Sequence, residues 1–161
     1  MYLPGTTIET PLAAGCAKRL LEPMFFGGGL VLSQVTALTG LEGHTVQNWV
    51  KRCYLPPPVN KKYDLRQFCR LLNISVLREC FTLEQSAGIL AHVNFILDDP
   101  NDDTFGDELL YFAFVDQICG EETGHLSKRT ERVLGLMALA WDIADTKQRA
   151  MRAYARMEGE R

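Results

Sequence analysis

Three consecutive prolines, at positions 56–58, constrain the fold of this chain more than any other feature. Proline has no backbone N–H and its ring clashes with the preceding helical turn, so the run excludes helix and keeps the backbone extended. Apolar residues with helical spacing lie on both sides of it. We therefore expect residues 54–63 to form a stiff loop or short hairpin between two helices, with Asn60, Lys61 and Lys62 exposed near its tip.

Two short helices are predicted before the prolines. The first runs over residues 33–38, with Ser33 as its N-cap, and Gly40 ends it. The second begins at His44 or Thr45, after a turn over residues 40–43, and continues to about Arg52. Its inner face carries apolar residues at i, i+3, i+4 and i+7, namely Val46, Trp49, Val50 and Cys53. Two short helices joined by a glycine-containing turn are typical of a helix-turn-helix.

The polar and basic residues on the outer face of the second helix predict contact with DNA bases. Asn and Gln bind adenine edges in the major groove, whereas Lys and Arg reach guanine or phosphate. The candidate base-reading residues are His44, Thr45, Gln47, Asn48 and Lys51. The candidate phosphate-binding residues are Arg52, Lys61, Lys62, Tyr63, Arg66 and Arg70. The alternative is an ordinary solvated helix face.

Capping residues mark further helices down the chain. Asp64, with Gln67 three residues later, begins the helix after the prolines, and Thr82 with Gln85 begins one that extends to about Leu97. An acidic loop follows, then a helix from near Asp107 to Gly120. Ser127 begins a last helix that extends to about Glu158. Its seam residues alternate three and four apart and are Thr130, Val133, Met137, Ala140, Ala144, Lys147, Met151 and Tyr154. That seam fits either a coiled coil or packing on the protein's own body.

These elements predict a mainly all-α protein with three parts. Residues 1–29 form an N-terminal arm and glycine-rich linker, residues 30–97 a winged helix-turn-helix domain, and residues 98–161 a helical C-terminal region for dimerisation or an effector.

Charge is segregated along the chain, although its formal net value is only −3. Residues 30–80 carry seven Lys or Arg and three acids, whereas residues 81–127 carry ten acids and no Lys or Arg. Because a polyanion such as DNA attracts the basic segment and repels the acidic one, this segregation orients one face of the protein toward it.

The remaining composition argues against other classes. No apolar run is long enough to span a membrane and the N-terminus lacks a signal peptide, so we expect a cytoplasmic protein. The five cysteines form no C-x-x-C pair and are expected mainly to pack in the core. The acids at Asp98, Asp99, Asp102 and Asp103 lack the spacing of a calcium loop, and residues 119–125 make a weak metal motif. We expect no catalytic residue, metal or cofactor, and therefore no enzyme.

Two resemblances follow from these residues. The chain resembles the MerR-type winged helix-turn-helix in the stretches 32–40 and 45–58, the basic wing, Tyr63 and residues 83–85. More closely, residues 32–35, 47–52 and 57–61 and the acidic Asp98-Asp99 region resemble the bacterial family called domain of unknown function 1836, from about Leu30 to Cys119.

The resemblance implies a transcription regulator that is dimeric through elements after the DNA-binding module, with no known ligand. MerR proteins usually have Arg where Gln47 stands and Gly where Cys53 stands, which leaves a phosphate contact and a left-handed helix stop without their usual residues.

We therefore expect a homodimer that binds double-stranded DNA, inserts the 44–52 helix into the major groove and places a basic wing on phosphates. The alternative is an adaptor that has the helix-turn-helix fold but acts through protein–protein contacts. Under both hypotheses, the question whether the protein binds a small-molecule effector stays open.

Overall fold

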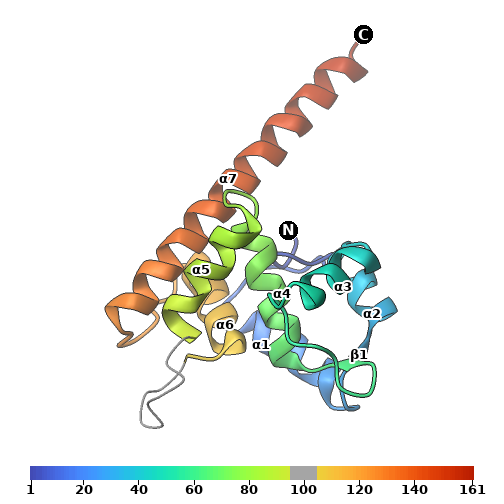
Figure 1. Cartoon of the computed structure of the whole chain (residues 1–161). Helices are drawn as coiled ribbons and strands as arrows, with labels where there is room; N and C mark the ends of the chain where they lie inside the picture. Colours follow the sequence, from blue (N-terminus) through green and yellow to red (C-terminus); the bar gives the residue numbers. More distant parts are fainter. Residues whose placement is uncertain (95–104) are drawn as a thin grey trace.

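Helices make up most of the chain, as the sequence predicts. The structure is a computed structural model that describes residues 1–94 and 105–161 (Figure 1). Its elements in chain order are α1 (Cys16–Leu21), the short 3-10 helix η1 (Glu22–Phe25), β1 (Leu30–Val31), α2 (Leu32–Thr39), α3 (Gly43–Lys51), β2 (Lys62–Tyr63), α4 (Leu65–Leu77), α5 (Leu83–Asn94), α6 (Asp107–Ile118) and α7 (Lys128–Gly159).

The predicted hairpin is present after the prolines. β1 and β2 pair antiparallel, with Leu30 opposite Tyr63 and Val31 opposite Lys62. At the tip, Val59 and Lys62 exchange two backbone hydrogen bonds, both 3.0 Å long. Asn60 and Lys61 between them have φ angles of 50° and 61°. Two central residues with positive φ are the signature of a type I′ turn. The predicted hairpin is therefore the tight turn that pairs Val59 with Lys62, and β1 is a second neighbour of β2 that the turn does not join to it.

A glycine is required where the linker reaches this sheet. Gly29 has a φ of 110°, and a Cβ there would lie 2.6 Å from the backbone oxygen of Tyr63. The glycine-rich segment therefore makes a close backbone approach to the sheet and is not a free linker.

Both helices before the hairpin differ slightly from expectation at their ends. α2 begins at Leu32, one residue before the expected Ser33, because the Gln34 side chain accepts a hydrogen bond from the Val31 N–H at 3.0 Å. α3 ends in a Schellman motif, in which the Cys53 N–H donates to Val50 O at 3.0 Å and the Tyr54 N–H to Trp49 O at 2.9 Å. Cys53 has a φ of 64°. The left-handed residue that ends the helix is therefore Cys53, at the position where MerR proteins usually have glycine.

Three of the four predicted N-caps are confirmed, whereas the prediction of Ser33 is wrong, because the N-cap of α2 is Val31 and Ser33 lies inside the helix. Asp64 accepts a hydrogen bond from the Gln67 N–H at 2.8 Å, Thr82 from the Gln85 N–H at 3.1 Å, and Ser127 from the Thr130 N–H at 3.2 Å. The predicted end of α5 near Leu97 and the acids Asp98, Asp99, Asp102 and Asp103 lie outside the described residues.

The N-terminal residues are packed into the core and do not form a free arm. Leu3, Cys16 and Leu21 are buried in the same apolar cluster as α4 and α6. The Tyr111 hydroxyl donates to Pro4 O, and the Thr7 N–H donates to Leu38 O at 2.7 Å. Residues 1–29 therefore contribute apolar surface that the helical core needs.

α7 has two unlike halves. The first packs on the body, where Thr130, Val133, Met137 and Ala140 are buried. Every residue of the stretch 146–161 is exposed, and this half projects away from the body (Figure 1). The expected seam is therefore a core face at its start, while its later members Lys147, Met151 and Tyr154 are exposed.

Among the described helices, none has both the length and the apolar character that a membrane span requires.

Candidate nucleic-acid interface

α3 is fixed by its inner face and free on its outer face. Val46 and Trp49 are buried in the core, with exposed fractions of 0% and 2%. The outward side chains of α3 are the candidate base-reading residues. His44, Gln47, Asn48 and Lys51 are exposed and Thr45 is partly buried. The helix therefore presents a polar and cationic face on a rigid base.

Hydrogen bonds tie the hairpin loop to α3 and α4. The carbonyl of Trp49 accepts hydrogen bonds from the N–H groups of both Tyr54 (2.9 Å) and Leu55 (3.3 Å). On the other side, Gln67 Nε2 donates to Pro57 O at 2.6 Å. The proline segment is thus held at both ends. In Figure 1, α3, α2 and the hairpin occupy the side of the molecule away from α5, α6 and the start of α7.

Four of the candidate phosphate-binding cations are exposed. Lys61 lies at the hairpin tip, Lys62 begins β2, and Arg66 lies in the first turn of α4. Arg52, at the end of α3, is also exposed. Its guanidinium lies 3.8 Å from a Glu84 carboxylate oxygen and 5.1 Å from the centre of the Tyr54 ring. The Arg52 guanidinium is therefore already engaged by Glu84 and Tyr54 on the protein surface.

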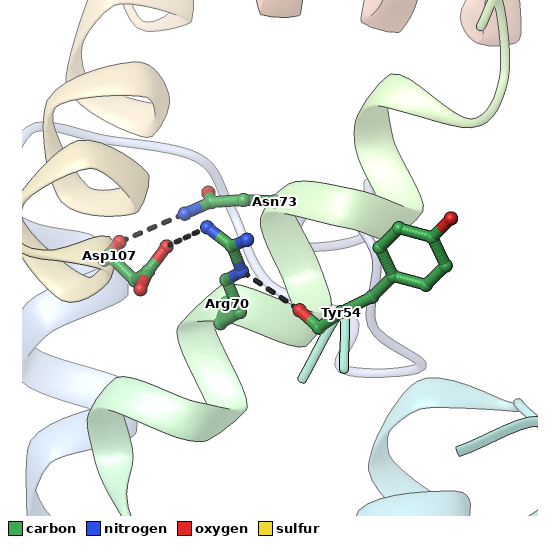
Figure 2. A network of polar contacts seen from close by, with 4 residues as sticks. All are labelled: Tyr54, Arg70, Asn73 and Asp107. Carbon is green, nitrogen blue, oxygen red and sulfur yellow. Dashed lines mark hydrogen bonds and ion pairs between the residues drawn. The ribbon is translucent and has the colours of Figure 1, made fainter. Parts of the chain in front are cut away.

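Arg70 is engaged inside the protein and is not part of the exposed surface (Figure 2). Its Nε donates to Tyr54 O at 3.1 Å, and its Nη1 lies 3.6 Å from Asp107 Oδ1. The Asn73 Nδ2 donates to Asp107 O at 3.0 Å. The side chain of Arg70 is only 16% exposed. It joins the base of the hairpin loop to the start of α6.

Tyr63 is buried as well, with an exposed fraction of 3%. Burial raises the pKa of its hydroxyl above the ordinary value. Tyr63 and Arg70 therefore have structural positions, and we leave both out of the proposed interface.

The sequence pattern underestimated the burial of α4. The apolar spacing of Leu65, Phe68, Leu72 and, less clearly, Val76 predicts a single inner face, whereas the helix packs against α5, α6 and α7. The polar side chains of Gln67 and Asn73 are consequently buried. The signal was available, because apolar residues between positions 68 and 77 point to several helix faces.

The cysteines divide between core and surface. Cys16 and Cys69 are buried, Cys119 is partly buried, and Cys53 and Cys80 are exposed. Burial, with a smaller contribution from Glu108, raises the pKa of the Cys69 thiol far above its ordinary value. Two cysteines therefore lie in the core and Cys119 packs against it, whereas Cys53 and Cys80 are exposed. No group of three His, Cys, Asp or Glu side chains suited to a metal ion lies within residues 1–94 and 105–161.

A cleft of about 760 Å³ lies between the N-terminal residues, the ends of α2 and α4, and α7. Trp49 and Trp141 both line it, together with Arg78 and Arg152. The Arg78 guanidinium lies 5.6 Å from the centre of the Trp49 ring. A small molecule in this cleft would contact both α3 and α7. Binding of a small-molecule effector stays a prediction.

Comparison with known families gives one match. The profile of the family described as a domain of unknown function (DUF1836) matches residues 29–113, more than half of the chain. Curated proteins and solved structures give no match.

Proposed function

The chain belongs to that family, and we propose that it is a DNA-binding transcriptional regulator in which α3 enters the major groove while the hairpin tip contacts phosphates. One observation carries the proposal. An exposed polar face on α3 and an exposed cationic tip, formed by Lys61 and Lys62, lie on one stretch of chain. This stretch is tied to the end of α3, where the Trp49 carbonyl accepts hydrogen bonds from the N–H groups of Tyr54 and Leu55.

Groove and backbone need different chemistry, and the two surfaces supply it. Base edges are read by groups that donate and accept hydrogen bonds, such as those of Gln47 and Asn48. Phosphate contacts need only positive charge and supply most of the affinity. Lys61, Lys62 and Arg66 are exposed cations at the hairpin tip, in β2 and in the first turn of α4.

The resemblance to the MerR-type winged helix-turn-helix supports the same reading, and with it the expectation that two copies bind one DNA site. A pair of identical heads related by a twofold axis would read two half-sites separated by about one or more turns of DNA. This places the base-reading residues of each copy on one half-site.

The hairpin tip allows a clean test of phosphate binding. Because Lys61 has a φ of 61°, which glycine adopts without strain, Lys61→Gly removes the charge and keeps the turn. Combined with Lys62→Gln, it should make the negative slope of log K against log salt less steep by about 0.9 for each lost contact, with little change in sequence preference. Fluorescence anisotropy on duplex DNA at several salt concentrations measures this slope. Lys128→Gln, an exposed cation at the start of α7, is the matched control and should leave the slope unchanged.

Base reading needs a different measurement. Selection of binding sites from random duplexes with the wild-type protein should yield a motif with twofold symmetry. Asn48→Ala should relax selection at one position of each half-site and cost about 1–3 kcal/mol of discrimination there. If the wild-type protein has no measurable affinity for duplex DNA at low salt, the proposal is wrong and the adaptor alternative takes its place.

A further inference from the structure

The two most exposed large apolar side chains within residues 1–94 and 105–161 both lie beside the hairpin tip. They are Phe26, with an exposed fraction of 82%, and Val59, with 70%. Single exposed apolar residues are ordinary, whereas a group of them marks a contact surface. Phosphate binding by the hairpin tip uses only its lysines and leaves these two side chains without a role.

Three side chains form a row on the outer face of the small sheet. Lys62 pairs antiparallel with Val31 on one side and with Val59 on the other. Because the side chains of directly opposed residues stand on the same face, Lys62 lies between the two valines. The opposite face contains Leu30 and Tyr63, which are buried.

Phe26 is held close to this row by the turn that follows η1 (Figure 1). The ring of its neighbour Phe25 packs on Phe68, with 5.6 Å between the ring centres, which anchors the turn to α4. A Cβ at Gly28 would lie 3.8 Å from Lys62 Nζ. Phe26 is two residues from Gly28, so their Cα atoms are at most about 7.6 Å apart. The Lys62 ammonium therefore reaches from the valine row toward Phe26.

The charge of this surface is wholly positive. Residues 23–34 and 55–63 contain no Asp or Glu, and Lys61 adds a second cation at the tip. Glu22 and Asp64 flank these segments, and the Asp64 carboxylate caps α4. An apolar and cationic surface of this kind complements the minor groove of duplex DNA, where phosphates line both edges and apolar side chains can enter between base steps.

We propose that Phe26 enters the minor groove next to the major groove that α3 occupies, and that it kinks the duplex there. An apolar side chain that enters between two base pairs partly unstacks them and bends the DNA. Lys61 and Lys62 contact the phosphates at the edges of this groove, while Val31 and Val59 pack on the sugars. This inference rests on the proposed function and adds to it a second groove, contacted by the N-terminal segment.

The kink gives the protein a sequence preference outside the bases that α3 reads. Pyrimidine–purine steps such as TA and CA unstack more easily than other steps. Sites selected from random duplexes by the wild-type protein should therefore contain such a step beside each α3 half-site. Selection with Phe26→Ala should lose this step and keep the bases read by α3.

Affinity and bend test the same contact. Phe26→Ala should weaken binding to the selected duplex about tenfold, because it removes one stacked aromatic ring. It should also reduce the bend, measured by energy transfer between dyes at the two duplex ends. The slope of log K against log salt should not change, because no charge is lost. Phe26→Leu, which stays large and apolar, should keep most of the bend.

The substitutions should not disturb folding, since the Phe26 side chain is 82% exposed, and equal urea midpoints check this. Leu109→Ala is the matched control, at a residue 49% exposed on α6, and should bind and bend DNA like the wild type. Unstacking is observed directly with 2-aminopurine at the selected step. Its fluorescence should rise on binding of the wild-type protein and stay low with Phe26→Ala.

An anionic membrane is the other surface that apolar and cationic side chains suit. Vesicles of phosphatidylglycerol and phosphatidylcholine should not bind the wild-type protein. Vesicle binding that is lost in Phe26→Ala, together with an unchanged duplex bend, would overturn the minor-groove contact in favour of the membrane.

This proposal and the proposed function fail in different ways. Equal affinity, bend and step preference in the wild type and Phe26→Ala would overturn the minor-groove contact and leave DNA binding by α3 and the hairpin lysines intact. A wild-type protein with no measurable affinity for duplex DNA at low salt would overturn both.

Discussion

α3 and the outer half of α7 both present an exposed helical face, but the two faces are built in opposite ways. α3 is short, anchored to the core by Val46 and Trp49, and polar on its free side. The outer half of α7 is long, unanchored, and apolar along one stripe. A polar face on a rigid helix suits reversible binding. An apolar face on a helix without other support suits a stable protein–protein interface.

Removal of the α3 anchor should give the largest effect on stability. Trp49→Ala deletes a buried indole and leaves a cavity under α3, which should lower the free energy of unfolding by about 3–5 kcal/mol. Tyr154→Ala, at a residue 57% exposed on α7, should change it by less than about 0.5 kcal/mol. Urea unfolding at a concentration where the protein is monomeric measures both. Equal losses would contradict the contrast between an anchored and an unanchored helix.

The two arginines of α4 should separate stability from binding. Arg70→Ala leaves the largely buried Asp107 carboxylate without one of its partners and should cost about 3 kcal/mol of folding stability. Arg66 is exposed, so Arg66→Ala should leave stability within about 0.5 kcal/mol and lower DNA affinity. Urea unfolding and DNA titration of both variants check this. A loss of stability in Arg66→Ala would show that the exposed surface near the hairpin is structural.

The end of α3 offers a smaller effect of opposite sign. Cys53 is held at a φ of 64°, a conformation that costs a residue with a Cβ about 1 kcal/mol relative to glycine. Cys53→Gly should therefore raise the free energy of unfolding by about 1 kcal/mol. Cys53→Ala, which keeps the Cβ, should be nearly neutral. If both variants behave alike, the helix stop is not strained.

Local signals in the sequence predicted most of the helices and the hairpin. The three caps at Asp64, Thr82 and Ser127 and the break at the prolines act over a few residues, so they can be read directly. The apolar spacing on α3 likewise predicted the burial of Val46 and Trp49.

Long-range contacts could not be predicted from these local signals. The burial of Arg70 depends on Asp107, which is distant in the sequence and meets it only because α6 packs on α4. The packing of Leu3 and Leu21 depends on the same core. For α7, the seam fitted either a coiled coil or packing on the protein's own body, and its first members Thr130, Val133 and Met137 are buried because α5, α4 and α6 lie against them.

The shared core also bears on how this protein can be divided for experiments. The segment that matches the family, residues 29–113, leaves out Leu3, Leu21, Val133 and Met137, all of which are buried against it. A recombinant fragment cut at those boundaries would expose apolar surface on two sides and should tend to aggregate. Fragments for crystallisation or NMR should keep the first turns of the chain and α7 at least to Trp141.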